Sequence, residues 1–124
     1  MIRIQAQFYK IDSWDDERAA LFADFREVWG RNYVVIGSEG GYVRNLCGQP
    51  YWRDEITDID VSFVHSASTL NLQFRTTLDQ GASDESWGVR RLYIFVGNCA
   101  NGCAVCTGIL PSDCTVTTDV VLFN

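Results

Sequence analysis

Two short acidic stretches, each containing a tryptophan, carry the residues whose types and spacing could do chemistry. The first is Ile-Asp-Ser-Trp-Asp-Asp-Glu at residues 11–17, and the second is Asp-Gln-Gly-Ala-Ser-Asp-Glu-Ser-Trp at residues 79–87. Clustered carboxylates suit Ca²⁺, a hard cation that takes about six to eight oxygen ligands. The pattern predicts a calcium site with ligands drawn from Asp12, Asp15, Glu17, Asp79, Asp84 and Glu85. The alternative is that both stretches are solvated surface loops, since exposed charges cost little.

The sequence offers no matching set of catalytic residues. His65 is the only histidine, and no motif places a serine or a cysteine beside it. The nucleophile pattern Gly-x-Ser-x-Gly is absent. The adjacent Asp84 and Glu85 would point to opposite sides of a strand, so they do not form a glycosidase pair. We therefore expect a protein that is not an enzyme.

The five cysteines point to an oxidising compartment. Cys99, Cys103, Cys106 and Cys114 fall within one short stretch, and Cys47 lies apart from them. Their spacing could also hold zinc, but the stretch contains no histidine, and we favour disulfides. We expect the four clustered cysteines to be oxidised. Cys47 would then be free or paired with another chain, unless it takes one of the four and leaves a different cysteine over.

Length and charge narrow the class of protein. A chain of 124 residues with 47% hydrophobic residues can form one domain with a sizeable core. Its formal charge is −6 and Lys10 is its only lysine, which argues against a nucleic-acid partner because such binding needs clustered basic residues. No apolar run approaches the roughly 20 residues that span a bilayer. Residues 1–8 alternate like a strand and not like a signal peptide, so we expect a mature or partial sequence.

Strand-like patterns account for most of the chain. Alternation of apolar and polar residues, or enrichment in β-branched and aromatic residues, marks residues 1–11, 27–30, 33–36, 56–65, 70–75 and 89–96. Residues 18–26 fit a helix or a strand. About eight strands separated by turns predict an all-β fold, a jelly-roll-like antiparallel sandwich of two sheets. The two tryptophan loops would lie at one end of it.

Several of these stretches resemble a β-sandwich module of extracellular cysteine-rich proteins from ciliates and other protists. The likeness covers roughly residues 8–106. It rests on the segments Phe-Tyr-Lys-Ile-Asp-Ser-Trp-Asp-Asp-Glu, Glu-Val-Trp, Ala-Ser-Thr-Leu-Asn-Leu-Gln-Phe-Arg-Thr-Thr-Leu-Asp-Gln and, most specifically, Asp-Glu-Ser-Trp-Gly-Val-Arg. The resemblance implies a strand at residues 18–26, an extracellular location and a Cys-rich tail that begins at Cys99. This chain departs from the family at its start, where upstream strands normally precede Phe8.

The segments suggest three parts: a sandwich domain at residues 1–97, a Cys-rich linker at 98–114 and a C-terminal strand at 115–124. We expect this strand to complete the sandwich of a neighbouring subunit, because missing upstream strands would leave a bare sheet edge. Its contacts would come from Val116, Val120, Leu122 and Phe123. The alternative is that the strand folds back onto its own sandwich.

Two functions follow from these expectations. The first is an extracellular structural protein, a subunit that forms a filament or surface matrix by head-to-tail strand exchange. The alternative is a calcium-dependent module that binds glycans. Trp14 and Trp87 bear on the choice, since they could be lids of the core or a platform on which sugars stack. We favour lids, because buried tryptophan is common at sandwich ends.

Overall fold

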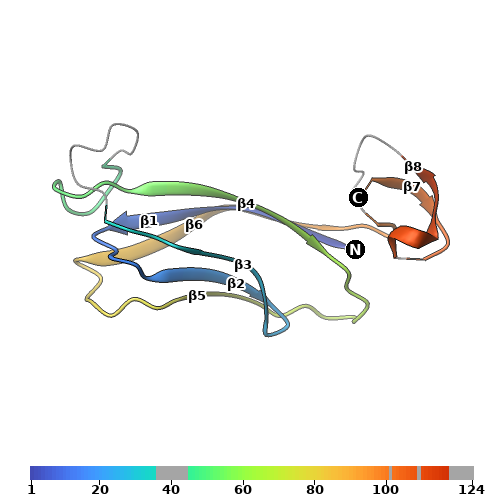
Figure 1. The fold of residues 1–124 in the computed structure, drawn as a ribbon, viewed down its shortest axis with the longest axis horizontal. Helices are drawn as coiled ribbons and strands as arrows, with labels where there is room; N and C mark the ends of the chain where they lie inside the picture. The colour runs from blue at the N-terminus through green and yellow to red at the C-terminus, as the bar shows by residue number, and fades with distance from the viewer. Residues whose placement is uncertain (36–44, 101, 109, 118–124) are drawn as a thin grey trace.

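The computed structural model describes residues 1–35, 45–100, 102–108 and 110–117, and shows two antiparallel sheets packed face to face (Figure 1). The first sheet has the order β4 (Glu55–Phe63), β1 (Ile2–Asp12), β6 (Glu85–Val96). The second has the order β3 (Arg26–Asn32), β2 (Arg18–Ala23), β5 (Leu72–Thr76). After β6 follow β7 (Cys103–Cys106), the short 3-10 helix η1 (Pro111–Asp113) and β8 (Cys114–Thr117). The predicted two-sheet all-β sandwich with a Cys-rich C-terminal extension is confirmed.

Strand β1 organises the molecule because its two faces differ in polarity. Its inward residues Ile2, Ile4, Ala6 and Phe8 are all buried, and the residues between them are only half-buried. Such alternation places every second side chain on the same face of a strand. Its outward face carries polar side chains that contact β4, the strand it pairs with. Arg3, for example, donates two hydrogen bonds to the carboxylate of Asp60.

The N-terminal strand does not lie at a sheet edge. We expected missing upstream strands to leave a sheet edge bare; β1 itself pairs with β4 on one side and with β6 on the other. Its apolar face explains this position, since a strand whose inward side chains are all buried belongs over the middle of the core. The edges of the two sheets are β4, β6, β3 and β5.

The ambiguous stretch at residues 18–26 forms strand β2 and the turn into β3. Ala19, Leu21 and Ala23 face the core, and Asp24 and Phe25 both have positive φ, of 46° and 65°. Two successive positive φ angles are typical of the tight turns that join antiparallel strands. The period-two pattern therefore prevailed over the helical propensity of alanine and leucine.

The strand predicted at residues 33–36 is wrong over its described part, because residues 33–35 lie outside any strand. The Tyr33 backbone bonds to the 16–17 loop, donating to the carbonyl of Glu17 and accepting from the amide of Asp16. Its ring is buried and its hydroxyl lies 2.7 Å from Thr57 Oγ1. Residue 36 lies outside the described residues.

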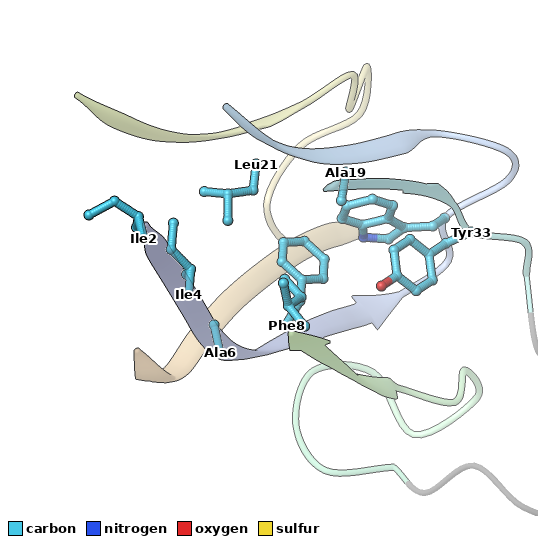
Figure 2. Packing of buried hydrophobic residues seen from close by; sticks show 9 residues of the cluster. Ile2, Ile4, Ala6, Phe8, Ala19, Leu21 and Tyr33 are labelled. Atoms are coloured by element: carbon cyan, nitrogen blue, oxygen red, sulfur yellow. The ribbon is translucent and has the colours of Figure 1, made fainter. Parts of the chain in front are cut away.

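The core is a cluster of aromatic rings around Phe8 with aliphatic side chains beside it (Figure 2). The ring of Phe8 lies 5.7 Å from that of Tyr33 and 6.0 Å from that of Trp14, centroid to centroid. Leu21 and Ala19 cover this cluster from the second sheet. These rings fix the spacing of the two sheets where the acidic loops begin.

Two disulfides hold the C-terminal stretch. Cys99 pairs with Cys106 and Cys103 pairs with Cys114, with Cα–Cα distances of 5.5 and 5.7 Å, and Cys47 is a free, exposed thiol. The four clustered cysteines are thus oxidised as expected. Such bridges are typical of proteins that fold in an oxidising compartment.

Strand β8 pairs with β7, and this pairing bears on the predicted donor strand. Val116 lies opposite Val105 in that hairpin, so the first part of the predicted strand is paired within its own chain. The boundary expected between residues 114 and 115 falls inside β8. Val120, Leu122 and Phe123 lie outside the described residues.

Candidate functional site

The inward face of β1 changes character at its end. The stripe that begins with Ile2 continues through Phe8 to Lys10 and Asp12, and both of these charged residues are buried. Asp54, Glu17 and Glu85 are buried around them. Charged groups are almost never fully buried unless they are paired, so each of these five should have identifiable partners.

Lys10 is the buried cation of this end. Its Nζ donates to the carbonyl of Arg53 at 3.0 Å. Burial lowers the pKa of Lys10, and the carboxylates of Asp54, Glu55, Asp12 and Glu17 oppose that shift. Sequence reasoning noted only that Lys10 is the sole lysine. Its place in the inward register of β1 was the signal that could have identified it.

Asp12 and Asp54 anchor the loop before β4. Asp54 accepts hydrogen bonds from the amides of Asp12, Leu46 and Cys47, at 3.0, 2.6 and 2.9 Å. Asp12 accepts from the amide of Gln49 at 2.8 Å, and burial raises its pKa. Asp12 was predicted to be a calcium ligand, but its carboxylate holds this loop. Asp54 was missed, because no local pattern relates it to Asp12.

Three of the six predicted ligands come together. One carboxylate oxygen from each of Asp15, Glu17 and Glu85 lies within 4.8 Å of the other two. Glu17 accepts from the amide of Asp15 at 2.6 Å, and Glu85 Oε2 accepts from the amide of Gln80 at 3.2 Å. Glu85 is 1% exposed, and its Oε1 has no hydrogen-bond partner among the described residues. Burial raises the pKa of Glu17, and the carboxylates of Asp15 and Glu85 add to that rise.

The other predicted ligands do not join this cluster. Asp79 is exposed, and Asp84 lies 3.3 Å from the side-chain amide of Gln49, which donates to it. The backbone carbonyl of Asp84 accepts from both the amide and the hydroxyl of Ser13, at 3.1 and 3.0 Å. The two acidic loops therefore meet at one end of the sandwich, as expected, but through their backbones as well as through their carboxylates.

The two loop tryptophans differ in exposure. Trp14 is fully buried, and its Nε1 donates to the carbonyl of Ser86 at 2.9 Å. Trp87 is 38% exposed, and its ring stacks on that of Phe8 at 5.6 Å. It also contacts the ring of Phe74 on β5, so it covers the core between the β5 and β6 edges. Trp14 is thus a core residue, and Trp87 is a half-open lid.

A second feature lies at the other end of the sandwich, along β6. Ile94 and Val96 pair with Ile4 and Ile2, so they share the inward face of the first sheet. They are nevertheless 46% and 58% exposed, and Leu92 is 46% exposed. These three side chains line a groove of about 820 Å³, whose other wall includes residues 65–70 and Leu72.

Near the acidic loops, the two sides of the sandwich are covered by different residues. On the side of β3 and β4, Arg31 forms an ion pair with Glu55, and the side chains of Arg31 and Tyr33 both bond to Thr57. On the side of β5 and β6, Trp87 covers the core near the acidic loops, and β5 is only five residues long. From Trp87 onwards, the 12-residue β6 runs away from the acidic loops, towards the start of β1 (Figure 1).

His65 takes a structural role at the mouth of this groove. Its Nε2 lies 2.8 Å from Asp24 Oδ2, at the turn between β2 and β3. Asp24 also accepts from the amide of Asn71 at 2.9 Å. This network ties the approach to β5 to the β2–β3 turn.

No protein-family model, curated protein or solved structure matches this chain. Among the described residues, no helix has the length and apolar character needed to cross a membrane.

Proposed function

We propose that this protein is an extracellular structural subunit, whose copies join when residues 118–124 of one copy add to β6 of the next. One observation carries the proposal: inward-facing Leu92, Ile94 and Val96, on an edge strand, are exposed over an open groove. The disulfides of the Cys-rich stretch support the extracellular location, because such bonds persist in oxidising compartments.

Strand β6 has the properties of an acceptor for an added strand. No described strand pairs with its outer edge, and its final residues present apolar side chains on both faces. Long apolar edge strands usually pair with another strand, because the added chain satisfies backbone groups and covers side chains. A strand laid beside β6 would place alternate side chains over the groove.

Residues 118–124 have a suitable sequence for the donor. They read Thr-Asp-Val-Val-Leu-Phe-Asn, so Val120 and Leu122 would share one face and Val121 and Phe123 the other. From first to last Cα, seven extended residues span about 20 Å, and the stretch from Leu92 to Val96 spans about 14 Å. We assign Val120 and Leu122 to the groove and Phe123 to the outer face. Val116, predicted with them, stays in β8.

This contact would propagate, because the donor and acceptor surfaces differ. A contact between two different surfaces builds an open chain unless its rotation happens to close a ring. The hairpin of β7 and β8 begins at Cys103, a short way along the chain from Gly97 and Asn98, which line the groove. Insertion of the tail into its own groove is therefore the competing arrangement, and the experiment must separate the two.

The test uses two variants that break opposite halves of the contact. Ile94→Asp disables the acceptor and Leu122→Asp disables the donor, and circular dichroism checks that both remain folded. Light scattering and electron microscopy should show filaments for the unaltered protein, monomers for each variant alone, and one-to-one dimers when the variants are mixed. Tyr93→Asp, on the outward face of β6, should leave assembly intact.

A monomeric unaltered protein at high concentration would overturn the proposal. Dimers or rings that stay closed would retain strand exchange but refute the filament. Self-insertion is recognised by a chain with Ile94→Cys and Leu122→Cys in a Cys47→Ser background. Mixed with a mass-labelled copy of itself, it would cross-link only within single chains.

The glycan-binding alternative has one supporting observation. Trp87 keeps 38% of its surface exposed two residues from Glu85, so an aromatic ring lies near the acidic cluster. One face of that ring is covered by Phe8, which leaves at most the other face for a sugar. A glycan array on the protein with calcium tests it, and Trp87→Ala should abolish any binding found.

A further inference from the structure

We propose that Asp15, Glu17 and Glu85 form a site for one divalent cation of the calcium class, which joins the two acidic loops. This site is independent of the proposed assembly, because the groove along β6 begins beyond Trp87 and is lined by none of these residues. These three residues are half of the six calcium ligands predicted from the sequence, and the fold brings only these three together.

The convergence of three carboxylates is the first observation. Two of them, Glu17 and Glu85, are 7% and 1% exposed, while Asp15 is exposed at the surface. Like charges this close repel one another strongly when they are removed from water. Lys10, the one buried cationic side chain among the described residues, has its ammonium on the carbonyl of Arg53. A divalent cation between the three carboxylates would remove the repulsion.

The unpartnered oxygen of Glu85 is the second and independent observation. Its Oε2 is bonded to the amide of Gln80, but Oε1 is buried without a partner among the described residues. Buried polar atoms nearly always have a partner, and an orphaned one is commonly explained by an ion or a water. Because Glu85 belongs to the three-carboxylate cluster, a cation there would satisfy this oxygen.

The ligand set favours calcium over smaller or softer metals. Mg²⁺ keeps several of its waters and is usually held by one or two carboxylates, whereas Ca²⁺ takes more protein oxygens in a flexible geometry. The convergence of three carboxylates here suits the larger ion. Three carboxylates without histidine or thiolate suit hard cations and not zinc or copper. Exposed Asp15 leaves a way in for the ion and for the waters that complete its shell.

The cation would act as a clamp between segments that are far apart in sequence. Asp15 and Glu17 lie between β1 and β2, and Glu85 begins β6. The same loops are already joined where Ser13 bonds to the carbonyl of Asp84. Binding to the folded state alone raises stability in proportion to the logarithm of cation concentration. We therefore expect a melting temperature that rises with Ca²⁺ after treatment with a chelator.

The decisive variant is Glu85→Gln, which keeps an oxygen for the Gln80 amide and removes the charge. It should make the cation-free protein more stable, because one of three mutually repelling carboxylates is lost, and it should also abolish the calcium-dependent rise in melting temperature. The two effects have opposite signs, which a merely structural glutamate would not produce. Asp79→Asn, on an exposed acid of the same loop, is the matched control and should change neither.

Binding itself can be followed with terbium, which replaces Ca²⁺ and is excited through nearby tryptophans such as Trp14. Terbium luminescence should rise on binding and fall when Ca²⁺, but not equimolar Mg²⁺, is added. Glu85→Gln should weaken binding by at least about tenfold, since it removes one of three charged ligands. The proposal is overturned if Ca²⁺ leaves the melting temperature of the chelator-treated protein unchanged, or if Glu85→Gln binds terbium as tightly as the unaltered protein.

Discussion

Replacing Lys10 by methionine tests how the charged end of the sandwich is held together. Methionine keeps the length and most of the volume of the lysine stem, so Lys10→Met creates little cavity. It removes the charge-assisted hydrogen bond from Nζ to the carbonyl of Arg53. It also removes the only buried cationic side chain among the described residues, which lies near the buried carboxylates of Asp12, Glu17 and Asp54.

The expected cost at pH 7 is large. The lost charged hydrogen bond contributes about 1.5–3 kcal/mol, and removing one partner of a buried ionic group typically costs about 3–5 kcal/mol in total. We take the latter figure for the change in the free energy of unfolding, because it includes the hydrogen bond. With a urea dependence of about 1.5 kcal/mol per molar, the midpoint of unfolding should fall by roughly 2–3 M.

The cost should shrink in mild acid. Burial raises the pKa values of Asp12 and Glu17, so each adds stability below its ordinary pKa and loses it as the pH rises through the raised value. When these carboxylates are protonated, the loss of the lysine charge leaves less repulsion behind. The difference between Lys10→Met and the unaltered protein should therefore be smaller at about pH 4.5 than at pH 7.

Urea titrations followed by circular dichroism, with chelator present at both pH values, measure this directly. Arg26→Met is the control, because it removes the same unit of charge from an exposed residue of β3 and should cost less than about 0.5 kcal/mol. If Lys10→Met costs no more than Arg26→Met at pH 7, the carboxylates are not balanced by Lys10 and the reasoning fails. An equal cost at both pH values would show that lost packing, and not charge, sets the effect.

Three further predictions concern stability and thiols. Trp14→Phe should lower the free energy of unfolding, measured with urea, by about 2–4 kcal/mol, because the carbonyl of Ser86 loses its buried donor and a void is left. A loss below about 1 kcal/mol would contradict the core position of Trp14. Gly48→Ala should lower the melting temperature, since Gly48 has φ +74° and an added Cβ would lie 2.1 Å from Asp12 Oδ2; an unchanged melting temperature would count against this loop conformation. Alkylation without reduction should label Cys47 alone in mass spectrometry, and labelling of further cysteines would refute the two disulfides.

The strand pattern and the oxidation state of the tail could be predicted from the sequence. Alternation over residues 1–11 and 56–65 depends on which side chains face the core, so it is visible along the chain itself. The dense cysteines likewise indicated disulfides, because their spacing and composition are local features. One missed case was Tyr33, whose backbone bonds to the 16–17 loop and not to a strand.

The candidate site, in contrast, was decided by tertiary structure. Six acidic residues looked equivalent in the sequence, but only pairing of β1 with β6 brings Glu85 next to the loop that carries Asp15 and Glu17. The same folding turns Asp12 inward against the loop before β4, where the backbone amide of Gln49 donates to its carboxylate. Exposure of Ile94 is also a tertiary property, because it depends on how far β5 extends over the facing sheet. The sequence determines which side chains each strand presents to one face of its sheet. The electrostatic environment of those side chains and the position of open sheet edges depend on which strands pair. A local sequence pattern does not encode the pairing.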